Sequence, residues 1–340
     1  MSLSSNPIGT LDGGDQQVNR LIGYVWGPVN AEDIAAVPGS EWVVTSGMVG
    51  QDAPLGRLYA VNRDDHSSSE LFPFQADYRI DEDRFGAIES LDPSKFEPHG
   101  IDVWQRPDGV VELYVVNHGW RESVEVFEIV LEGRRPALRW IGAAVLPEPL
   151  TGNDVAAAGD GGFALSVNET DPTGPFARSI LPDSGAVMAW TAPAGWTRVP
   201  GSEINSANGI ALSLDGKWMF LGGWRSASIK KISRIDGQSE TVSTGILTDN
   251  ITWAADGSLW AAGPAVTPEQ FFAARSGPQA HLGVPSRVLR VDPETLTMDS
   301  MLDYPGQVFT AATTGLQLAE EIWVGTAHGP GLARFTMPAG

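Results

Sequence analysis

A pattern of polar and apolar residues recurs six times along this chain of 340 residues. In each repeat a polar residue is followed by a second polar residue or glycine, and then by a short apolar alternation typical of a half-buried strand. The six starts are Glu32-Asp33-Ile34, His99-Gly100-Ile101, Asn153-Asp154-Val155, Asn208-Gly209-Ile210, Asp249-Asn250-Ile251 and Thr314-Gly315-Leu316. We interpret each start as the point just before a strand, where the chain enters a unit of paired strands.

A turn, a second strand and a third strand are predicted after each start. Asp-Gly pairs at 108–109, 160–161, 215–216 and 256–257 lie between apolar alternations, which is a strong hairpin signal. The predicted second strands are 41–46, 110–117, 163–167, 217–222, 258–262 and 321–326. The predicted third strands are 56–62, 123–130, 185–190, 228–234, 287–291 and 332–335.

Three strands and a less regular fourth, repeated six times, are typical of a six-bladed β-propeller. The predicted fold class is therefore all-β, with one propeller domain over residues 1–340 and a flexible segment at 1–19. Residues 21–28 are the candidate strand that closes the ring, and Thr267–Arg275 is the best candidate helix, with Thr267 as N-cap. The alternative is a two-sheet sandwich or two smaller β domains, but no linker or composition shift divides the chain.

The composition narrows the possible partners. With 22 Lys and Arg against 42 Asp and Glu, the net charge is −20, which disfavours binding to nucleic acid or to anionic membranes. There is no cysteine, so disulfides, thiolate catalysis and cysteine-ligated zinc are excluded. The first 19 residues lack a basic start and an apolar run, and no stretch is long and apolar enough to span a membrane. These features predict a cytoplasmic protein.

The starts of the six repeats supply mostly oxygen donors and one imidazole. In a radial fold their side chains would meet at one axis, where the carboxylate and amide oxygens favour Ca²⁺ over Zn²⁺, with Mg²⁺ or Mn²⁺ as alternatives. Gly at the second position indicates crowding, because only glycine lets two backbones approach closely. Taken singly, an Asp-Gly or Asn-Gly pair is also a common turn.

Two histidines of the second repeat, His99 and His118, are candidates for a dyad in which one imidazole positions or deprotonates the other. The alternative is two unrelated hydrogen-bonded histidines. Side chains near the ends of loops are predicted to form the wall of a substrate site: Trp120, Trp224, Phe271, Phe272, Thr314 and His328. Neither the Gly-x-Ser-x-Gly elbow nor the His-Glu-x-x-His zinc motif occurs.

Several of these motifs, in order, resemble the paraoxonase/arylesterase family. The resemblance rests on 96–101 (Phe-Glu-Pro-His-Gly-Ile), 113–118 (Leu-Tyr-Val-Val-Asn-His), 123–127, 152–155, 207–210, 248–251 and 323–326. It extends over residues 30–336 and, more loosely, to gluconolactonase-like and strictosidine-synthase-like propellers. Unlike the secreted animal members, this chain has no apolar N-terminus and no cysteines, and its insert at 263–286 departs from the expected pattern.

The resemblance implies two calcium ions in the central tunnel of the propeller. The catalytic ion would be held by Glu32, Asn153, Asn208, Asp249 and Asn250. The deeper, structural ion would be held by Asp33, Asp154 and the backbone carbonyl of Ile101, and His99 with His118 would form the family's dyad.

The main functional hypothesis is a calcium-dependent hydrolase of lactones and aryl esters. One alternative keeps the fold and the metal but changes the chemistry, to a sugar-acid lactone, an isomerisation or carbon–carbon bond formation. The other is a binding propeller without catalytic activity, stabilised by its metal.

Overall fold

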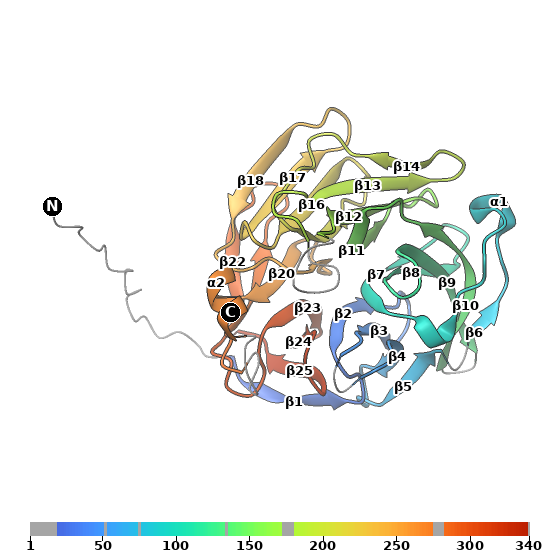
Figure 1. The fold of residues 1–340 in the computed structure, drawn as a ribbon. Helices are drawn as coiled ribbons and strands as arrows, with labels where there is room; N and C mark the ends of the chain where they lie inside the picture. Colours follow the sequence, from blue (N-terminus) through green and yellow to red (C-terminus); the bar gives the residue numbers. More distant parts are fainter. Residues whose placement is uncertain are drawn as a thin grey trace, which may run out of the picture.

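In the computed structural model, which describes residues 19–50, 53–73, 76–132, 135–171, 180–274 and 282–338, six sheets surround a central axis (Figure 1). The polar starts found in the sequence lie in or beside the innermost strand of each sheet. These innermost strands are β2 (Ala31–Ala36), β7 (Pro98–Gln105), β11 (Leu150–Ala157), β15 (Ala207–Leu212), β19 (Ile251–Trp253) and β23 (Ala312–Leu318). The predicted six-bladed β-propeller is confirmed, and the blades are numbered one to six in this order.

The other strands follow outwards in each blade. The second strands are β3 (Trp42–Gly47), β8 (Val111–Asn117), β12 (Phe163–Glu169), β16 (Trp218–Gly223), β20 (Leu259–Pro264) and β24 (Glu321–Thr326). The third strands are β4 (Arg57–Asn62), β9 (Ser123–Glu132), β13 (Ala186–Thr191), β17 (Ser228–Ser233), β21 (Ser286–Val291) and β25 (Gly331–Thr336). The fourth strands are β5 (Ser68–Phe72), β10 (Arg135–Val145), β14 (Gly195–Arg198), β18 (Ser239–Ser243), β22 (Met298–Tyr304) and β1 (Leu21–Trp26).

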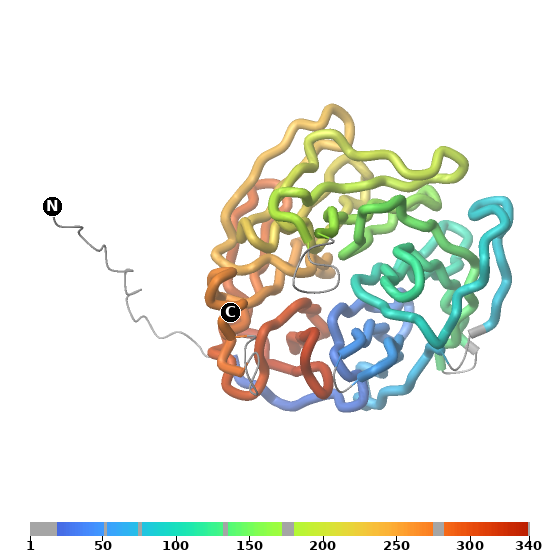
Figure 2. Tube along the Cα trace, viewed as in Figure 1, coloured from blue at the N-terminus to red at the C-terminus, as the bar shows by residue number. Residues whose placement is uncertain are grey.

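The ring is closed by the N-terminal strand. β1 pairs antiparallel with β25 as the outermost strand of blade six, and Figure 2 shows this blue segment alongside the red C-terminal blade. Asn19 precedes β1, and its side-chain amide donates to the carbonyls of Met301 (2.8 Å) and Thr336 (2.9 Å). Asn19 is therefore buried and held, contrary to the expectation of a flexible segment, while residues 1–18 lie outside the described ranges.

Helices are few among the described residues. The connection from blade one to blade two contains β6 (Ala76–Tyr78), parallel to β10, with α1 (Glu82–Phe85) and the 3₁₀ helix η1 (Pro93–Lys95). The predicted helix is α2 (Pro268–Ala274), and the last residue of the expected range, 275, lies outside the described residues. Thr267 and Gln270 form a capping box, in which each side chain accepts the other residue's backbone amide. No helix in the described ranges has the length and apolar character needed to cross a membrane.

The apolar core is divided into six clusters, one at each contact between neighbouring blades. Leu58 of blade one, for example, packs with Leu113 of blade two, and Val43 of blade one packs with Trp323 of blade six. The other four clusters join blades two and three, three and four, four and five, and five and six. Because the apolar side chains pack between blades, the polar residues of the innermost strands are left to face the axis.

Candidate active site

β-Bulges place the predicted site residues. In five of the six blades the pairing of the innermost strand shifts register at or beside the polar start, so the expectation that these residues precede their strands is wrong there. The shifts fall at Glu32, His99-Gly100, Asn153-Asp154, Asn208-Gly209 and Thr313. Only in blade five does the strand begin after the pair, at Ile251. Because a bulge adds an unpaired residue and re-aims its side chain, five blades direct a polar group at the axis by the same device.

The glycines at the second position reflect close contact between blades. A Cβ atom on Gly100 would lie 2.5 Å from Oδ1 of Asp154 and 2.7 Å from the carbonyl oxygen of Asn153. A Cβ atom on Gly209 would lie 2.3 Å from the carbonyl oxygen of Asp249. All three distances are shorter than real Cβ contacts, so the predicted crowding is confirmed at these two positions.

Three blades converge on Glu32. The side-chain amide of Asn250 donates to Glu32 Oε1 over 2.8 Å, and Nε2 of His99 lies 3.6 Å from the same oxygen. The hydroxyl of Thr313 donates to the backbone carbonyl of Glu32 over 2.6 Å. The Glu32 side chain is only 1% exposed, so its carboxylate is held by these contacts rather than by solvent.

Asp249 belongs to the same cluster. The side chains of Asn208 and Trp224 hydrogen-bond to its carboxylate, and its backbone carbonyl accepts the amide of Gly209 over 3.1 Å. Asp249 is close enough to Glu32 for the two carboxylates to repel each other. The structure therefore brings Glu32, Asn208, Asp249 and Asn250 together as the sequence predicted.

His99 and His118 are in contact. Nδ1 of His99 lies 2.9 Å from Nε2 of His118, with the ring planes at 62°. On its other side, Nδ1 of His118 lies 2.9 Å from Oε2 of Glu122. The His99 side chain is 16% exposed and that of His118 is 8% exposed. A chain of four side chains thus runs from Glu32 at the axis, through both histidines, to Glu122 in the loop between β8 and β9.

Deeper along the axis, aspartates join neighbouring blades. The Asp33 carboxylate accepts the backbone amides of Ile34 (2.8 Å) and of Ile101 in the next blade (2.9 Å). Asp154 accepts those of Val155 and Ile210 in the same way, each over 2.8 Å. Asp102 repeats this arrangement between blades two and three, because its carboxylate accepts the backbone amides of Val103 and Ala157.

Burial and mutual repulsion disfavour the charged forms of these carboxyl groups. Burial raises the pKa of Glu32 well above its usual value, and the carboxylates of Asp33 and Asp249 raise it further, against the hydrogen bond from Asn250. Burial likewise raises the pKa of Asp154, with a further contribution from Asp33. Burial also raises the pKa of Asp249, although hydrogen bonds from its neighbours oppose the shift. A positive charge among them would remove this penalty.

The pKa values of two aspartates are raised towards neutrality. Burial raises the pKa of Asp33 to about 6, against hydrogen bonds from the amides of Ile101 and Ile34 and from the Thr314 side chain. Burial raises the pKa of Asp102 to about 7, and the nearby Asp33 carboxylate adds to the shift.

The donor set fits a hard divalent cation. Among the described residues, Glu32 Oε2 and the Oδ1 atoms of Asn153, Asn208 and Asn250 are buried and receive no hydrogen bond. Leaving a buried acceptor without a donor costs free energy, and four such oxygens in or beside the innermost strands call for a common partner. In the described ranges no group of three or more His, Cys, Asp or Glu side chains is placed to hold a metal, so a cation here would depend on the amide oxygens.

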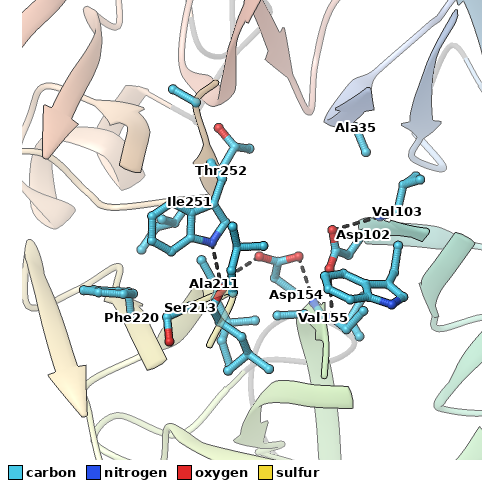
Figure 3. A pocket seen from close by; sticks show the side chains of 18 of the residues that line it. Ala35, Asp102, Val103, Asp154, Val155, Ala211, Ser213, Phe220, Ile251 and Thr252 are labelled. Atoms are coloured by element: carbon cyan, nitrogen blue, oxygen red, sulfur yellow. Dashed lines mark hydrogen bonds between the residues drawn. The ribbon is translucent and has the colours of Figure 1, made fainter. Parts of the chain in front are cut away.

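The axis opens into a cavity of about 660 Å³ at the end of the innermost strands away from the histidines. Figure 3 shows Asp102 and Asp154 among its lining side chains, with Ala35, Val103 and Thr252 around them. The cavity therefore reaches the deeper aspartates from the face opposite the dyad.

The predicted wall residues fall into two groups. The rings of Trp224, Phe271 and Phe272 contact one another, with centroids 5.0 to 6.1 Å apart. Trp120 is stacked under Arg121, which lies 4.7 Å above its ring.

The other two predicted wall residues lie apart from these rings. Thr314 is fully buried beside Asp33, and His328 is exposed in the loop between β24 and β25. A role in substrate contact stays a prediction for all six wall residues.

Three residues of the site were not predicted from the sequence. Glu122 lies in a loop, four positions after His118, where spacing does not indicate contact. Asp102 directly follows Ile101 in the His-Gly-Ile-Asp run, and the only sign of its place in the site is that it is an acidic residue next to a predicted start. Thr313 directly precedes Thr314, the predicted start of the sixth repeat, and the bulge of this blade falls at Thr313.

Comparison with known proteins places this arrangement in a family. The family model described as arylesterase matches residues 29–329. Serum paraoxonase/arylesterase 1 of Mus musculus is 36% identical over 137 residues, which are 39% of this chain and 37% of that protein. Serum paraoxonase/lactonase 3 of Homo sapiens is 27% identical over 169 residues, 48% of this chain and 47% of that protein. The chain thus spans less than half the length of these curated relatives.

A solved gluconolactonase from Xanthomonas campestris has the same fold, with a TM-score of 0.55 at 16% identity over 98% of this chain and 99% of that one. The family match is more specific than the fold. It includes the Glu32 start, both histidines and all six innermost strands. The chain belongs to the arylesterase family.

Proposed function

We propose that this protein is a hydrolase of lactones and aryl esters that requires Ca²⁺. The observation that supports this most is the position of the donor-less oxygens: Glu32 carries one of them and also lies 3.6 Å from His99. Glu32 therefore belongs to the candidate cation site and also contacts His99, the candidate base. Family membership supports the same class of reaction.

The residues that would hold the ions are those expected from the family resemblance. Glu32, Asn153, Asn208, Asp249 and Asn250 would bind the catalytic ion. Asp33, Asp154 and the carbonyl of Ile101 would bind the deeper one. When bound, Ca²⁺ supplies Lewis-acid polarisation of the ester carbonyl.

The histidines would supply the base. His99, supported by His118, accepts a proton from water at Nε2, and the hydroxide oxygen attacks the carbonyl carbon. The carbon–oxygen bond to the leaving group then breaks, and the alkoxide or phenolate takes up the proton from His99. Water is consumed, and the products are a carboxylic acid and an alcohol. The burial of both imidazoles keeps them oriented for this transfer.

The rings above Asp249 support an apolar substrate portion. Trp224 bonds to this carboxylate through its indole and contacts Phe271 and Phe272 of α2 through its ring. An aryl or alkyl group placed against these rings would lie beside the cation site.

A titration of acid release tests the proposal. Purified protein in calcium buffer is offered γ-lactones, δ-lactones, sugar lactones and aryl esters, with and without a chelator, and the chelated sample is then resupplied with Ca²⁺. Acid release that stops on chelation and returns with calcium is expected. No hydrolysis of any of these esters would overturn the proposal, and would favour a different chemistry on the same fold or a binding role.

A further inference from the structure

Glu122 lies in a loop whose shape is fixed by its neighbour Asn117. The Asn117 side chain donates to the carbonyls of Gly119 (3.0 Å) and Arg121 (3.3 Å), and its oxygen accepts the amide of Glu97 over 3.0 Å. Trp120 within this loop has φ +70°, a left-handed conformation uncommon for such a residue. The loop between β8 and β9 is therefore held in one shape.

The Glu122 carboxylate is in turn held in one position. Its Oε2 lies 2.9 Å from Nδ1 of His118, 3.1 Å from the hydroxyl of Thr151 and 3.4 Å from the backbone amide of Gly152. Thr151 and Gly152 belong to β11, so two blades fix the carboxylate. The Thr151 hydroxyl and the Gly152 amide both donate to this oxygen, and a ring nitrogen of His118 faces it, which is an arrangement that suits a negatively charged acceptor.

These contacts determine which ring nitrogens carry hydrogen. An ionised carboxylate only accepts, so Nδ1 of His118 carries the hydrogen and Nε2 of the neutral ring has the lone pair. The 2.9 Å contact then requires a hydrogen on Nδ1 of His99, which puts the lone pair of His99 on Nε2. That nitrogen is the one on the side of Glu32, at 3.6 Å from its carboxylate.

We propose that Glu122 is a positioning residue for the reaction: it sets the tautomers of both histidines and stabilises the positive charge that forms on them. This inference rests on the proposed hydrolysis. When Nε2 of His99 takes a proton from water, the hydrogen on its Nδ1 passes to Nε2 of His118. His118 is then an imidazolium ion beside the Glu122 carboxylate, and the reverse transfer protonates the leaving group. One proton enters and one leaves, as in a carboxylate–histidine pair that orients a base.

A purely structural role for Glu122 is the alternative, in which it only ties the loop to β11. Glutamine at this position keeps the length of the side chain and one oxygen that can accept from Thr151 and Gly152, but it has no charge. Glu122→Gln therefore separates the two roles. Glu128→Gln is the matched control, because Glu128 lies in the same blade, is 24% exposed against 22% for Glu122, and pairs with Arg139.

The kinetic test uses the full chain in calcium buffer with the best ester from the substrate screen. For Glu122→Gln we expect kcat to fall about tenfold or more, but by less than the roughly 10²–10⁴-fold that a positioned base contributes in total. KM and the unfolding temperature should stay near those of the unchanged protein. The Glu128→Gln control should match the unchanged protein in KM and in unfolding temperature. A Glu122→Gln protein with full kcat would overturn the proposal while leaving the hydrolytic function standing.

The second test does not depend on activity. Long-range ¹H–¹⁵N spectra of protein labelled with ¹⁵N-histidine report which ring nitrogen carries hydrogen, and a His118→Gln sample identifies the His118 signals. The expected spectrum shows hydrogen on Nδ1 of His118 in the unchanged protein, and a mixture of tautomers in Glu122→Gln. If His118 carries its hydrogen on Nε2 instead, the proposal is overturned, whether or not any ester is hydrolysed.

Discussion

The side-chain amide of Asn250 donates a hydrogen bond to the Glu32 carboxylate over 2.8 Å, although 218 positions separate the two residues in the chain. The bond links blade five to blade one, which are not neighbours in the ring. It also sets the amide orientation: with Nδ2 towards Glu32, Oδ1 of Asn250 is the atom that receives no hydrogen bond among the described residues. Both side chains thereby keep one oxygen available for a shared cation.

Replacing Glu32 should therefore remove calcium binding and activity together. Changes in groups that merely orient metal ligands cost about 10–100-fold in affinity, so removing the negative charge of a direct ligand in Glu32→Gln should exceed this range. Calorimetric titration of chelator-treated protein with calcium measures the affinity, and acid release measures the activity. Asp102→Asn is the control, because Asp102 joins blades two and three but is assigned to neither ion. Equal losses in both variants would contradict the ligand assignment.

Removing calcium should make the stability of the protein depend on pH. The pKa of Asp33 is raised to about 6 and that of Asp102 to about 7 in the folded protein, against 3.8 for an unperturbed aspartate. As pH rises from about 4 to 7, the unfolded chain releases these protons first, so the free energy of unfolding of the metal-free protein should fall across this window. The penalty from these two aspartates is complete once the pH is well above 7.

Thermal unfolding from pH 5 to pH 8, with chelator or with calcium, measures this effect. The chelated protein should melt at a lower temperature at pH 8 than at pH 5. Calcium at about 100 times its dissociation constant adds about 2.7 kcal/mol of stability and should offset much of the loss at pH 8. A chelated protein that is more stable at pH 8 than at pH 5 would show that these aspartates are not buried beside one another.

The blades were predictable because the apolar alternation of their second and third strands is local. All twelve of these predicted strands are present, with ends within two residues of the prediction. The start of α2 was likewise predictable from Thr267, the predicted N-cap, and its neighbours. The closing strand β1 was found because a run of apolar residues precedes the first repeat.

The bulges were not predictable, because a bulge interrupts the alternation that identifies a strand. His99 and Gly100 therefore seemed to precede a strand, whereas β7 already begins at Pro98. Glu122 escaped notice for a different reason: its contact with His118 depends on the fold of a short loop, and its contact with Thr151 depends on the packing of two blades. Neither relationship leaves a periodic pattern in the sequence.

Adding one methyl group at Gly100 should disturb the axis. In Gly100→Ala the new atom would lie 2.5 Å from Asp154 Oδ1, and the neighbouring backbone leaves little room to move. Overpacking of this kind costs about 1–3 kcal/mol, and the displaced aspartate should also weaken calcium binding. Gly23→Ala is the control, because its nearest neighbour would be a flexible arginine atom at 3.8 Å. Chemical denaturation and calcium titration of both variants measure the difference, and equal stabilities would contradict the crowding.

Replacing His99 should slow hydrolysis without removing calcium. Glutamine cannot act as a base, so we expect His99→Gln to lower kcat by about 10²–10⁴-fold, while the oxygen ligands remain. His66→Asn is the control, since His66 lies in a turn at φ +59°, a conformation that asparagine tolerates. If His99→Gln keeps the full rate with lactones, the dyad is not the base, and another group must activate the water.

The aromatic cluster allows substrate binding to be separated from the chemistry. Trp224 has two contacts: its indole bonds to the Asp249 carboxylate, and its ring packs on Phe271 and Phe272. Trp224→Phe removes the first and keeps most of the second, so it should lower calcium affinity. Phe272→Ala removes apolar surface at the edge of the cluster, together with the contact of this ring with Arg225. A half-exposed ring of this kind contributes about 1–2 kcal/mol, so KM for aryl esters should rise roughly 5- to 30-fold with kcat little changed.

Kinetics with one aryl ester and one small aliphatic lactone decide whether these rings form the substrate wall. The lactone has little apolar surface to lose, so its KM should stay nearly constant in Phe272→Ala while that of the aryl ester rises. The Trp224→Phe protein should need more calcium for half-maximal activity with both substrates, because its defect lies at the Asp249 carboxylate. Equal effects of Phe272→Ala on both substrates would mean that α2 acts on the fold of the site rather than on substrate contact.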